Sequence, residues 1–133
     1  MKRLFLSLML LTLLSGVAVA KDSFSSMSEA QIKTLFCHKW KLTYLEFKGK
    51  KKEIPAKLPA SLLIFLADGN LQEFEGSKKY DGKWTYNHST KTVVTVDKDG
   101  TENHKIINLT DDEFVMNGKY QGFTFNMGFK RLD

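Results

Sequence analysis

Cysteine and proline are scarce in this chain, which has one cysteine, Cys37, and two prolines, Pro55 and Pro59. A single cysteine excludes an intramolecular disulfide, so a hydrophobic core must stabilise the fold instead of cross-links. Proline cannot donate to a strand ladder, so the stretch that holds both prolines is expected to be the longest connection. The remainder of the chain is free to form paired strands.

Long hydrophobic runs are absent beyond the first residues. Residues 4–14 form an uncharged apolar run that follows two basic residues and precedes Ala18-Val19-Ala20. This order is typical of a cleavable secretory signal, and the run is shorter than the roughly 20 residues needed to span a bilayer. We expect a signal peptide over residues 1–20 and a mature chain that starts at Lys21. No cysteine stands at the cleavage point, so a periplasmic or secreted protein without a lipid anchor is predicted.

Motifs for catalysis and metal binding are also missing. The three histidines, His38, His88 and His104, are far apart and are not joined by a second cysteine. A metal site needs three or four converging ligands, so none is predicted. Acidic residues such as Glu73 and Glu75 fall in the polar phases of predicted strands, where we expect solvated surface and not a catalytic pair. The sequence therefore predicts a non-enzymatic protein without a cofactor.

The charge balance is mildly basic. The chain has 20 basic residues, two of them in the predicted signal, so 18 basic and 15 acidic residues remain after residue 20. Much of the excess lies in Lys48, Lys50, Lys51 and Lys52, at a predicted hairpin tip. Such a tip keeps a loop solvated, and contact with an anionic surface is the alternative. Aromatic residues share strand faces with aliphatic ones, so nucleic acid is not an expected partner.

Alternation of apolar and polar residues is the strongest positive signal. Residues 62–131 contain seven short β-type runs separated by turn signals, and the last run, 123–131, alternates strictly. A period of two gives a strand one dry face and one wet face. With the strand around Trp40 the count is eight, which suits a closed antiparallel up-and-down barrel. We predict one all-β domain over residues 28–133, because this length supplies a single core.

A short helix is predicted before the first strand. Ser28 offers an N-cap with a glutamine three positions on, and Ile32, Leu35 and Phe36 occupy positions i, i+3 and i+4. The apolar stripe has no other partner than the barrel, so the helix is expected to close one end. Residues 21–27 are predicted to be a flexible leader.

Five segments resemble the bacterial lipocalin-like domain family. They follow the family's order and spacing from residue 35 to the C-terminus, and the resemblance implies a small barrel whose cup binds hydrophobic molecules. The segments are Trp40-Lys41-Leu42-Thr43, Leu63-Ile64-Phe65-Leu66-Ala67-Asp68-Gly69, Gly82-Lys83-Trp84-Thr85, Ile106-Ile107-Asn108-Leu109-Thr110-Asp111-Asp112 and Phe129-Lys130-Arg131-Leu132.

The resemblance also implies a structural pair at the closed end. In lipocalins a tryptophan of the first strand lies under an arginine of the last strand, and Trp40 and Arg131 match these positions. His38 stands where the family has a glycine. Arg131 is in phase with Phe129, so it should point toward the interior end of the barrel, where an unpaired charge is costly. A guanidinium over the indole face is the expected partner contact.

The barrel interior is the candidate binding site. Its expected lining consists of seven aromatic residues: Phe65, Phe74, Trp84, Tyr86, Phe114, Phe123 and Phe125. Two functions stay open. The barrel is either a monomeric binding protein for a small apolar or amphipathic ligand, or a packed barrel that acts through its loops as a protein inhibitor or envelope interaction module. Ligand identity does not follow from the sequence.

Overall fold

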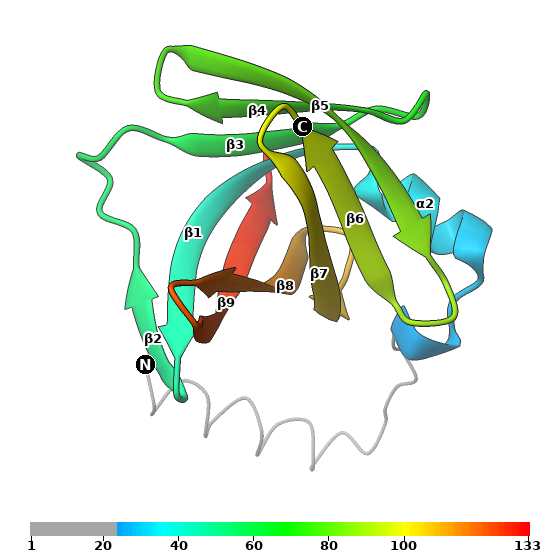
Figure 1. Ribbon diagram of the computed structural model, residues 1–133. Coiled ribbons are helices and arrows are strands. Elements are labelled where there is room, and N and C mark those ends of the chain that lie inside the picture. The colour runs from blue at the N-terminus through cyan, green and yellow to red at the C-terminus, as the bar shows by residue number, and fades with distance from the viewer. Residues whose placement is uncertain (1–23) are drawn as a thin grey trace.

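The computed structural model describes residues 24–133, so the predicted signal and the first residues of the predicted leader lie outside the described part. Within residues 24–133, neither helix has the length and mean hydropathy needed to cross a bilayer. Figure 1 shows two short helices followed by antiparallel strands. The elements are η1 (Phe24–Ser26), α2 (Glu29–Phe36), β1 (Lys39–Phe47), β2 (Lys50–Glu53), β3 (Ser61–Phe65), β4 (Asn70–Glu75), β5 (Lys78–Asn87), β6 (Thr92–Asp97), β7 (Gly100–Leu109), β8 (Glu113–Tyr120) and β9 (Phe123–Arg131).

Eight of the described strands form a closed barrel. Strand β1 is followed in the ladder by β3 to β9 in sequence order, and β9 pairs back with β1. Every pair is antiparallel, so neighbouring strands are joined in the up-and-down manner. The predicted all-β, eight-stranded, antiparallel up-and-down barrel with a short N-terminal helix is confirmed.

Strand β2 is an addition to the predicted eight. It pairs with the second half of β1, whereas the first half of β1 pairs with β3, so one edge of β1 has two neighbours in succession. The β1–β2 turn is at Lys48 and Gly49, which have φ of 50° and 77°. Two consecutive positive φ values match the twist of a tight hairpin. The lysines that follow are therefore strand residues, and only Lys48 belongs to the predicted tip.

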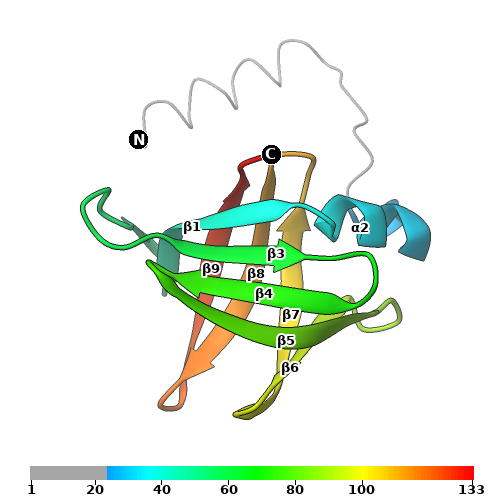
Figure 2. The same ribbon diagram turned by 90° about the horizontal axis from the view of Figure 1, so that it is seen from above.

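Helix α2 closes one end of the barrel, opposite the ends of the β4–β5 and β8–β9 hairpins (Figure 2). The Ser28 hydroxyl accepts a hydrogen bond from Gln31 N at 3.2 Å, and the Gln31 side chain accepts one from Ser28 N at 2.8 Å. This reciprocal cap fixes the start of the helix. Ile32 and Phe36 are fully buried and Leu35 packs against the core, which confirms the predicted apolar stripe.

The segment before α2 also belongs to the fold. Phe24–Ser26 form a single 3-10 turn, in which Met27 N donates to Phe24 O at 3.1 Å. Phe24 and Met27 pack against the core. The predicted leader is therefore packed from Phe24 onward, and residues 21–23 lie outside the described part.

The core fills the closed half of the barrel and is centred on Phe36. Its ring is surrounded, at centroid distances of 5.3–6.3 Å, by Phe65, Phe114, Trp84 and Tyr86. Large aromatic side chains bury about 150–250 Å² each, so this cluster is a major source of stability. The helix thus covers the end of the barrel and inserts Phe36 into the core.

Arg131 and Trp40 are cross-strand neighbours, as the strand register predicted. The Trp40 indole packs edge-on against Phe114 at 4.8 Å and donates to Phe36 O at 3.1 Å. The guanidinium of Arg131 instead donates to backbone oxygens, from Nε to Asp133 O at 2.9 Å and from Nη1 to Asp111 O at 3.2 Å. The expected cation–π contact is therefore replaced by bonds that tie the C-terminus to the β7–β8 turn.

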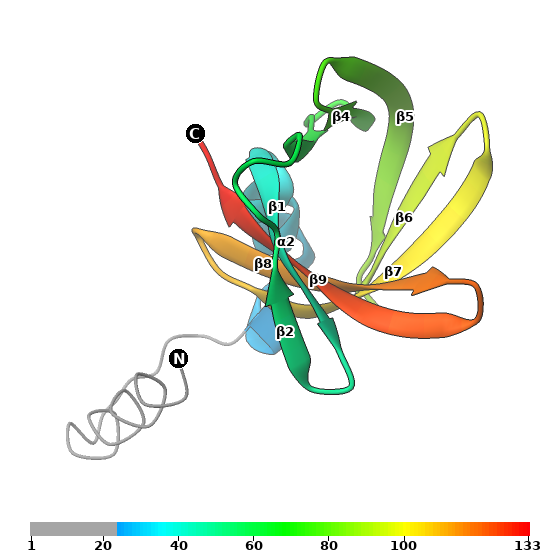
Figure 3. The ribbon, with the colours of Figure 1, turned by 90° about the vertical axis from the view of Figure 1, so that its left-hand side faces the viewer.

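The open half of the barrel has gaps in its ladder. Strand β5 pairs with β6 only from Lys83 onward, and β7 pairs with β8 only from Ile106 onward. Toward the mouth the hairpins β4–β5, β6–β7 and β8–β9 consequently diverge (Figure 3). Gly82 lies inside β5, where a Cβ would come within 2.7 Å of Val96 O. Close approach of two backbones explains that glycine.

Candidate functional site

The aromatic residues predicted to line one cup are divided between the two halves. Four of them, Phe65, Trp84, Tyr86 and Phe114, pack around the helix in the closed half and do not border the cavity at the open end. The polar atoms of this group are also occupied, since Trp84 Nε1 donates to Leu66 O at 2.8 Å and Tyr86 Oη lies 3.0 Å from His88 Nδ1. Any contact of these four with a ligand stays a prediction.

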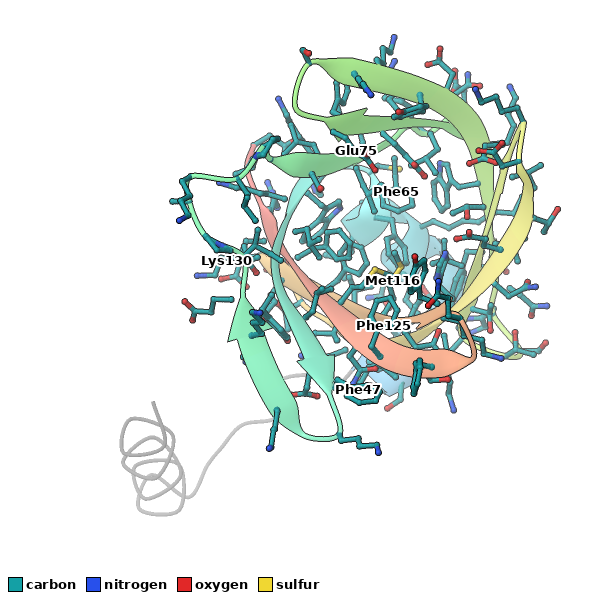
Figure 4. All side chains as sticks on the ribbon, turned by 60° about the vertical axis from the view of Figure 1, so that its left-hand side comes forward. Phe47, Phe65, Glu75, Met116, Phe125 and Lys130 are labelled. Atoms are coloured by element: carbon teal, nitrogen blue, oxygen red, sulfur yellow. The ribbon has the colours of Figure 1, made fainter. Side chains whose placement is uncertain are left out.

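Two of the remaining aromatics lie toward the mouth on β9. Phe125 is half-buried and packs over Gly118, where a Cβ would lie 3.0 Å from the ring. Figure 4 shows Phe125, Met116 and Phe65 inside the barrel and Lys130 outside it. Phe123 is at the rim and is largely exposed.

Phe74 lies on the opposite face of β4 from the interior face that the sequence predicted. It pairs with Leu62 and Lys79, and lies three residues from Leu71, which is buried and sets the interior phase. Residues at odd spacing point to opposite faces of a strand. Phe74 therefore belongs to the outer face of β4, although it also borders the mouth cavity.

A cavity of about 180 Å³ opens at the mouth of the barrel. Its apolar lining comes mainly from β1, β3, β8 and β9, with Phe74 from β4, and consists of Leu42, Leu62, Leu63, Phe74, Met116, Met127 and Phe129. Its polar lining comes from β3, β4, β6 and β7 and includes Ser61, Glu73, Glu75, Thr95, Glu102 and His104. The cavity is thus apolar on one wall and rich in carboxylates on the other.

Glu73 and Glu75 face the interior because Leu71 does. Leu71, Glu73 and Glu75 occupy every second position of β4, so their side chains share a face. The expectation of solvated surface is wrong for Glu73, which is half-buried inside the mouth of the barrel, whereas Glu75 is exposed at the rim of the same cavity. The even spacing from Leu71 was the signal that could have located them.

The environment of Glu73 is unfavourable for a charge. Burial raises the pKa of this carboxyl above its usual value, and repulsion from Asp97, Glu102 and Glu75 raises it further. In the described part of the chain, the ion pairs join other side chains, and none includes Glu73. A half-buried carboxylate among like charges creates a negative potential directed into the cavity.

His104 links two strands where their ladder is interrupted. Its Nδ1 lies 2.8 Å from Asn117 O on β8, so this nitrogen carries a proton and donates. Its Nε2 faces Glu102 Oε2 at 3.2 Å. The side chain is almost fully buried. His104 therefore holds β7 near β8 while presenting its second nitrogen to the carboxylate wall.

A larger hollow, of about 410 Å³, lies outside the barrel between β1 and the connection over residues 54–60. Tyr44 forms part of it, with its ring over Gly128, where there is no room for a Cβ. Lys51 Nζ lies 4.0 Å above the same ring. Three lysines and two glutamates line this groove, so neither charge dominates. Its contacts are accounted for by packing of the hairpin on the barrel wall.

Within residues 24–133, no three His, Cys, Asp or Glu side chains are grouped so as to hold a metal ion. Cys37 is a free thiol whose pKa is raised by burial, which reduces the reactive thiolate fraction.

Comparison with known proteins gives a likeness of fold. No protein-family model matches the chain, and no curated protein matches it. Among solved structures, the crystal structure of a lipocalin-like protein from Bacteroides uniformis is similar, with 16% sequence identity and a TM-score of 0.45. The match covers 74% of this chain and 99% of that chain.

Proposed function

We propose that this protein is a non-enzymatic binding protein that holds a small amphipathic molecule with a positively charged group in the mouth of its barrel. The observation that supports the proposal is the position of Glu73, a half-buried carboxylate beside an apolar cavity and three other carboxylates. A cation would compensate this charge. The apolar part of the same molecule would cover Leu42, Met116 and Met127.

The size of the cavity limits the part of the ligand that enters. An apolar cavity of about 150 Å³ accepts benzene, whereas pockets for drug-sized ligands are about 300–1,000 Å³. At about 180 Å³ the mouth cavity suits one ring or a short alkyl chain. The aromatic cluster around Phe36 fills the closed half below it, so a longer ligand would extend outward from the mouth.

An anionic amphiphile such as a fatty acid fits this site less well. Its carboxylate would enter next to Glu73, Glu75 and Glu102, and juxtaposed like charges disfavour binding. The same apolar wall would be available to both classes of ligand. The charge of the polar wall therefore favours the amine.

Two probes with the same ring and opposite charge test the proposal, 2-phenylethylammonium and phenylacetate. In calorimetric or NMR titrations the amine should bind saturably, and phenylacetate should bind at least about tenfold more weakly. A tenfold difference in affinity requires that the charged wall discriminate between the probes by only about 1.4 kcal/mol. Glu73→Gln should remove most of this difference. Glu53→Gln, in the outer groove, is the matched control and should leave both affinities unchanged.

Several results would contradict the proposal. Equal affinity for both probes, or an amine affinity that Glu73→Gln leaves unchanged, would show that the carboxylate wall does not select the ligand. Absence of saturable binding by either probe would remove the cavity as a binding site.

An interaction module that acts through its loops is the second candidate. It is favoured by the packed closed half of the barrel and by the exposed rings of Phe47 and Phe123 at hairpin ends. Export to the periplasm or the medium would suit either function. This location stays a prediction, because residues 1–23 lie outside the described part.

A further inference from the structure

A basic and aromatic surface stands on one side of the mouth. It lies at the ends of the β1–β2 and β8–β9 hairpins, whose course is seen in Figure 3, and Phe47 is labelled in Figure 4. The rings of Phe47 and Phe123 meet edge to face at 5.8 Å, and Tyr120 pairs with Phe123 across the β8–β9 ladder. The exposed fractions of these side chains are 39% for Phe47, 59% for Phe123 and 67% for Tyr120. We call this surface the hairpin tip; it comprises Phe47, Lys48, Lys50, Lys52, Tyr120 and Phe123.

The register of β1 and β2 places lysines beside these rings. Lys50 is directly opposite Phe47, and Lys52 is directly opposite Leu45. Residues directly opposite in an antiparallel pair share a face. Lys48 Nζ lies 5.4 Å from the centre of the Phe47 ring. Ammonium groups thus surround exposed aromatic rings on one face of the hairpin.

The acidic residues of the same hairpin lie on its other face. Glu46 is opposite Lys51, and Glu53 is opposite Tyr44, so both belong to the face that Lys51 shares with the Tyr44 ring. Glu46 also accepts a hydrogen bond from Asn126 Nδ2 at 3.2 Å. The face that carries Phe47 and Leu45 therefore combines apolar surface with uncompensated positive charge.

We propose that the hairpin tip docks the protein on an anionic lipid surface. Lysines near such a surface are attracted by its negative potential, and aromatic side chains gain by entering the interface between headgroups and acyl chains. The charge of the tip is complementary to anionic headgroups. The inference goes beyond ligand binding in the cavity and uses none of the residues on its carboxylate wall.

A soluble polyanion is the other partner that a lysine cluster could attract. A sulfated or phosphorylated polysaccharide would use the ammonium groups and would leave the rings of Phe47 and Phe123 in water. A lipid surface uses both. The exposed rings among the lysines therefore favour lipid.

The test is binding to vesicles of phosphatidylcholine with or without phosphatidylglycerol. The chain from Lys21 is suitable, since residues 24–133 contain the whole closed barrel and its core. The protein should sediment with phosphatidylglycerol vesicles and not with phosphatidylcholine alone, and added salt should weaken this binding. Lys50→Glu with Lys52→Glu should lower the partition coefficient at least about tenfold.

Two further variants complete the experiment. Phe47→Ser with Phe123→Ser should lower vesicle binding several-fold without a change in charge. Lys98→Glu with Lys105→Glu makes the same charge change at exposed lysines in the β6–β7 turn and on β7, away from the tip, and should keep binding within about twofold of the unmodified chain. All variants should retain the circular dichroism spectrum and the 2-phenylethylammonium titration of the unmodified chain, which separates this proposal from the cavity proposal.

Three outcomes would overturn the inference. The first is no binding of the unmodified chain to phosphatidylglycerol vesicles. The second is equal loss in the Lys98 and Lys105 control, which would indicate net charge alone. The third is full vesicle binding by the Phe47 and Phe123 variant together with displacement by heparin, which would make the tip a polyanion site.

Discussion

The closed and open halves of the barrel are built on different principles. In the closed half the interior is filled by apolar side chains, with Phe36 inserted among four aromatic rings. In the open half the hairpins separate, and the interior carries Glu73, Glu102 and His104 beside an apolar wall. The same strands run through both halves. The difference shows that one barrel can hold its packed core at one end and a polar interior, the site proposed here for a ligand, at the other.

The largest effect on stability is expected for Phe36→Ala, which tests this division between the two halves. Truncation of a fully buried phenylalanine leaves a cavity and typically costs about 3–5 kcal/mol, so urea denaturation should show a loss of this size. Phe123→Ala at the mouth should cost less than about 1 kcal/mol, as is usual for exposed positions. Similar losses at the two sites would show that the halves contribute equally to stability.

Arg131→Lys tests whether the closed end depends on the guanidinium fork. Its two bonds to Asp111 O and Asp133 O come from a charged group, and such bonds contribute about 1.5–3 kcal/mol each at most. Because the side chain is partly exposed and lysine can replace only one bond, we expect a loss of about 1–2 kcal/mol in urea denaturation. A loss that is unmeasurable would mean that the C-terminus is not tied to the β7–β8 turn.

Hydrogen exchange would sharpen the comparison at the level of the backbone. Amides of residues 78–81, where β5 pairs only with β4 and the side chains are exposed, should exchange at least about tenfold faster than those of residues 84–86, which pair with β6 and carry the buried Trp84 and Tyr86. Exchange followed by NMR would resolve both stretches of the same strand. Uniform protection along β5 would contradict the division into two halves.

Glu73→Gln should have the smallest effect on stability, and with a sign that depends on pH. The pKa of Glu73 is raised in the folded protein, so the folded state binds this proton more tightly than the unfolded chain and the ionised form disfavours folding. At pH 7 the variant should be more stable by a few tenths of a kcal/mol, because solvent screens a half-exposed carboxylate. The gain should disappear as the pH falls below about 4.5, the usual value for glutamate. A gain that persists in acid would point to another cause.

Sequence reasoning succeeded where apolar residues face inward. Trp40, Trp84 and Phe114 point inward, as expected, because the closed half obeys the rule that apolar side chains point to the core. The same rule failed for Glu73 and Phe74, since at the mouth the interior is polar. Counting alternate positions from the interior residue Leu71 would have assigned both Glu73 and Phe74 to the correct face of β4.

The position of the cavity could not be predicted from the sequence for a related reason. Phe65, Trp84 and Tyr86 were expected around a cup, yet they surround Phe36, because the helix extends its ring into the barrel. The apolar stripe of α2 indicated that the helix closes the barrel but not how far its side chains enter. Depth of insertion depends on packing between distant elements, which spacing along one chain does not encode.

The arrangement of β2 also bears on self-association. β2 has a single neighbour in the ladder, so its other side leaves backbone donors and acceptors available for pairing with a second chain. Its residues Lys50, Lys51 and Lys52 place positive charge along that edge. Two such edges would repel each other, and stacking of barrels through strand addition is thereby discouraged. Charge reversal keeps this protection, whereas replacement by valine or threonine would expose the chain to aggregation at its own hairpin.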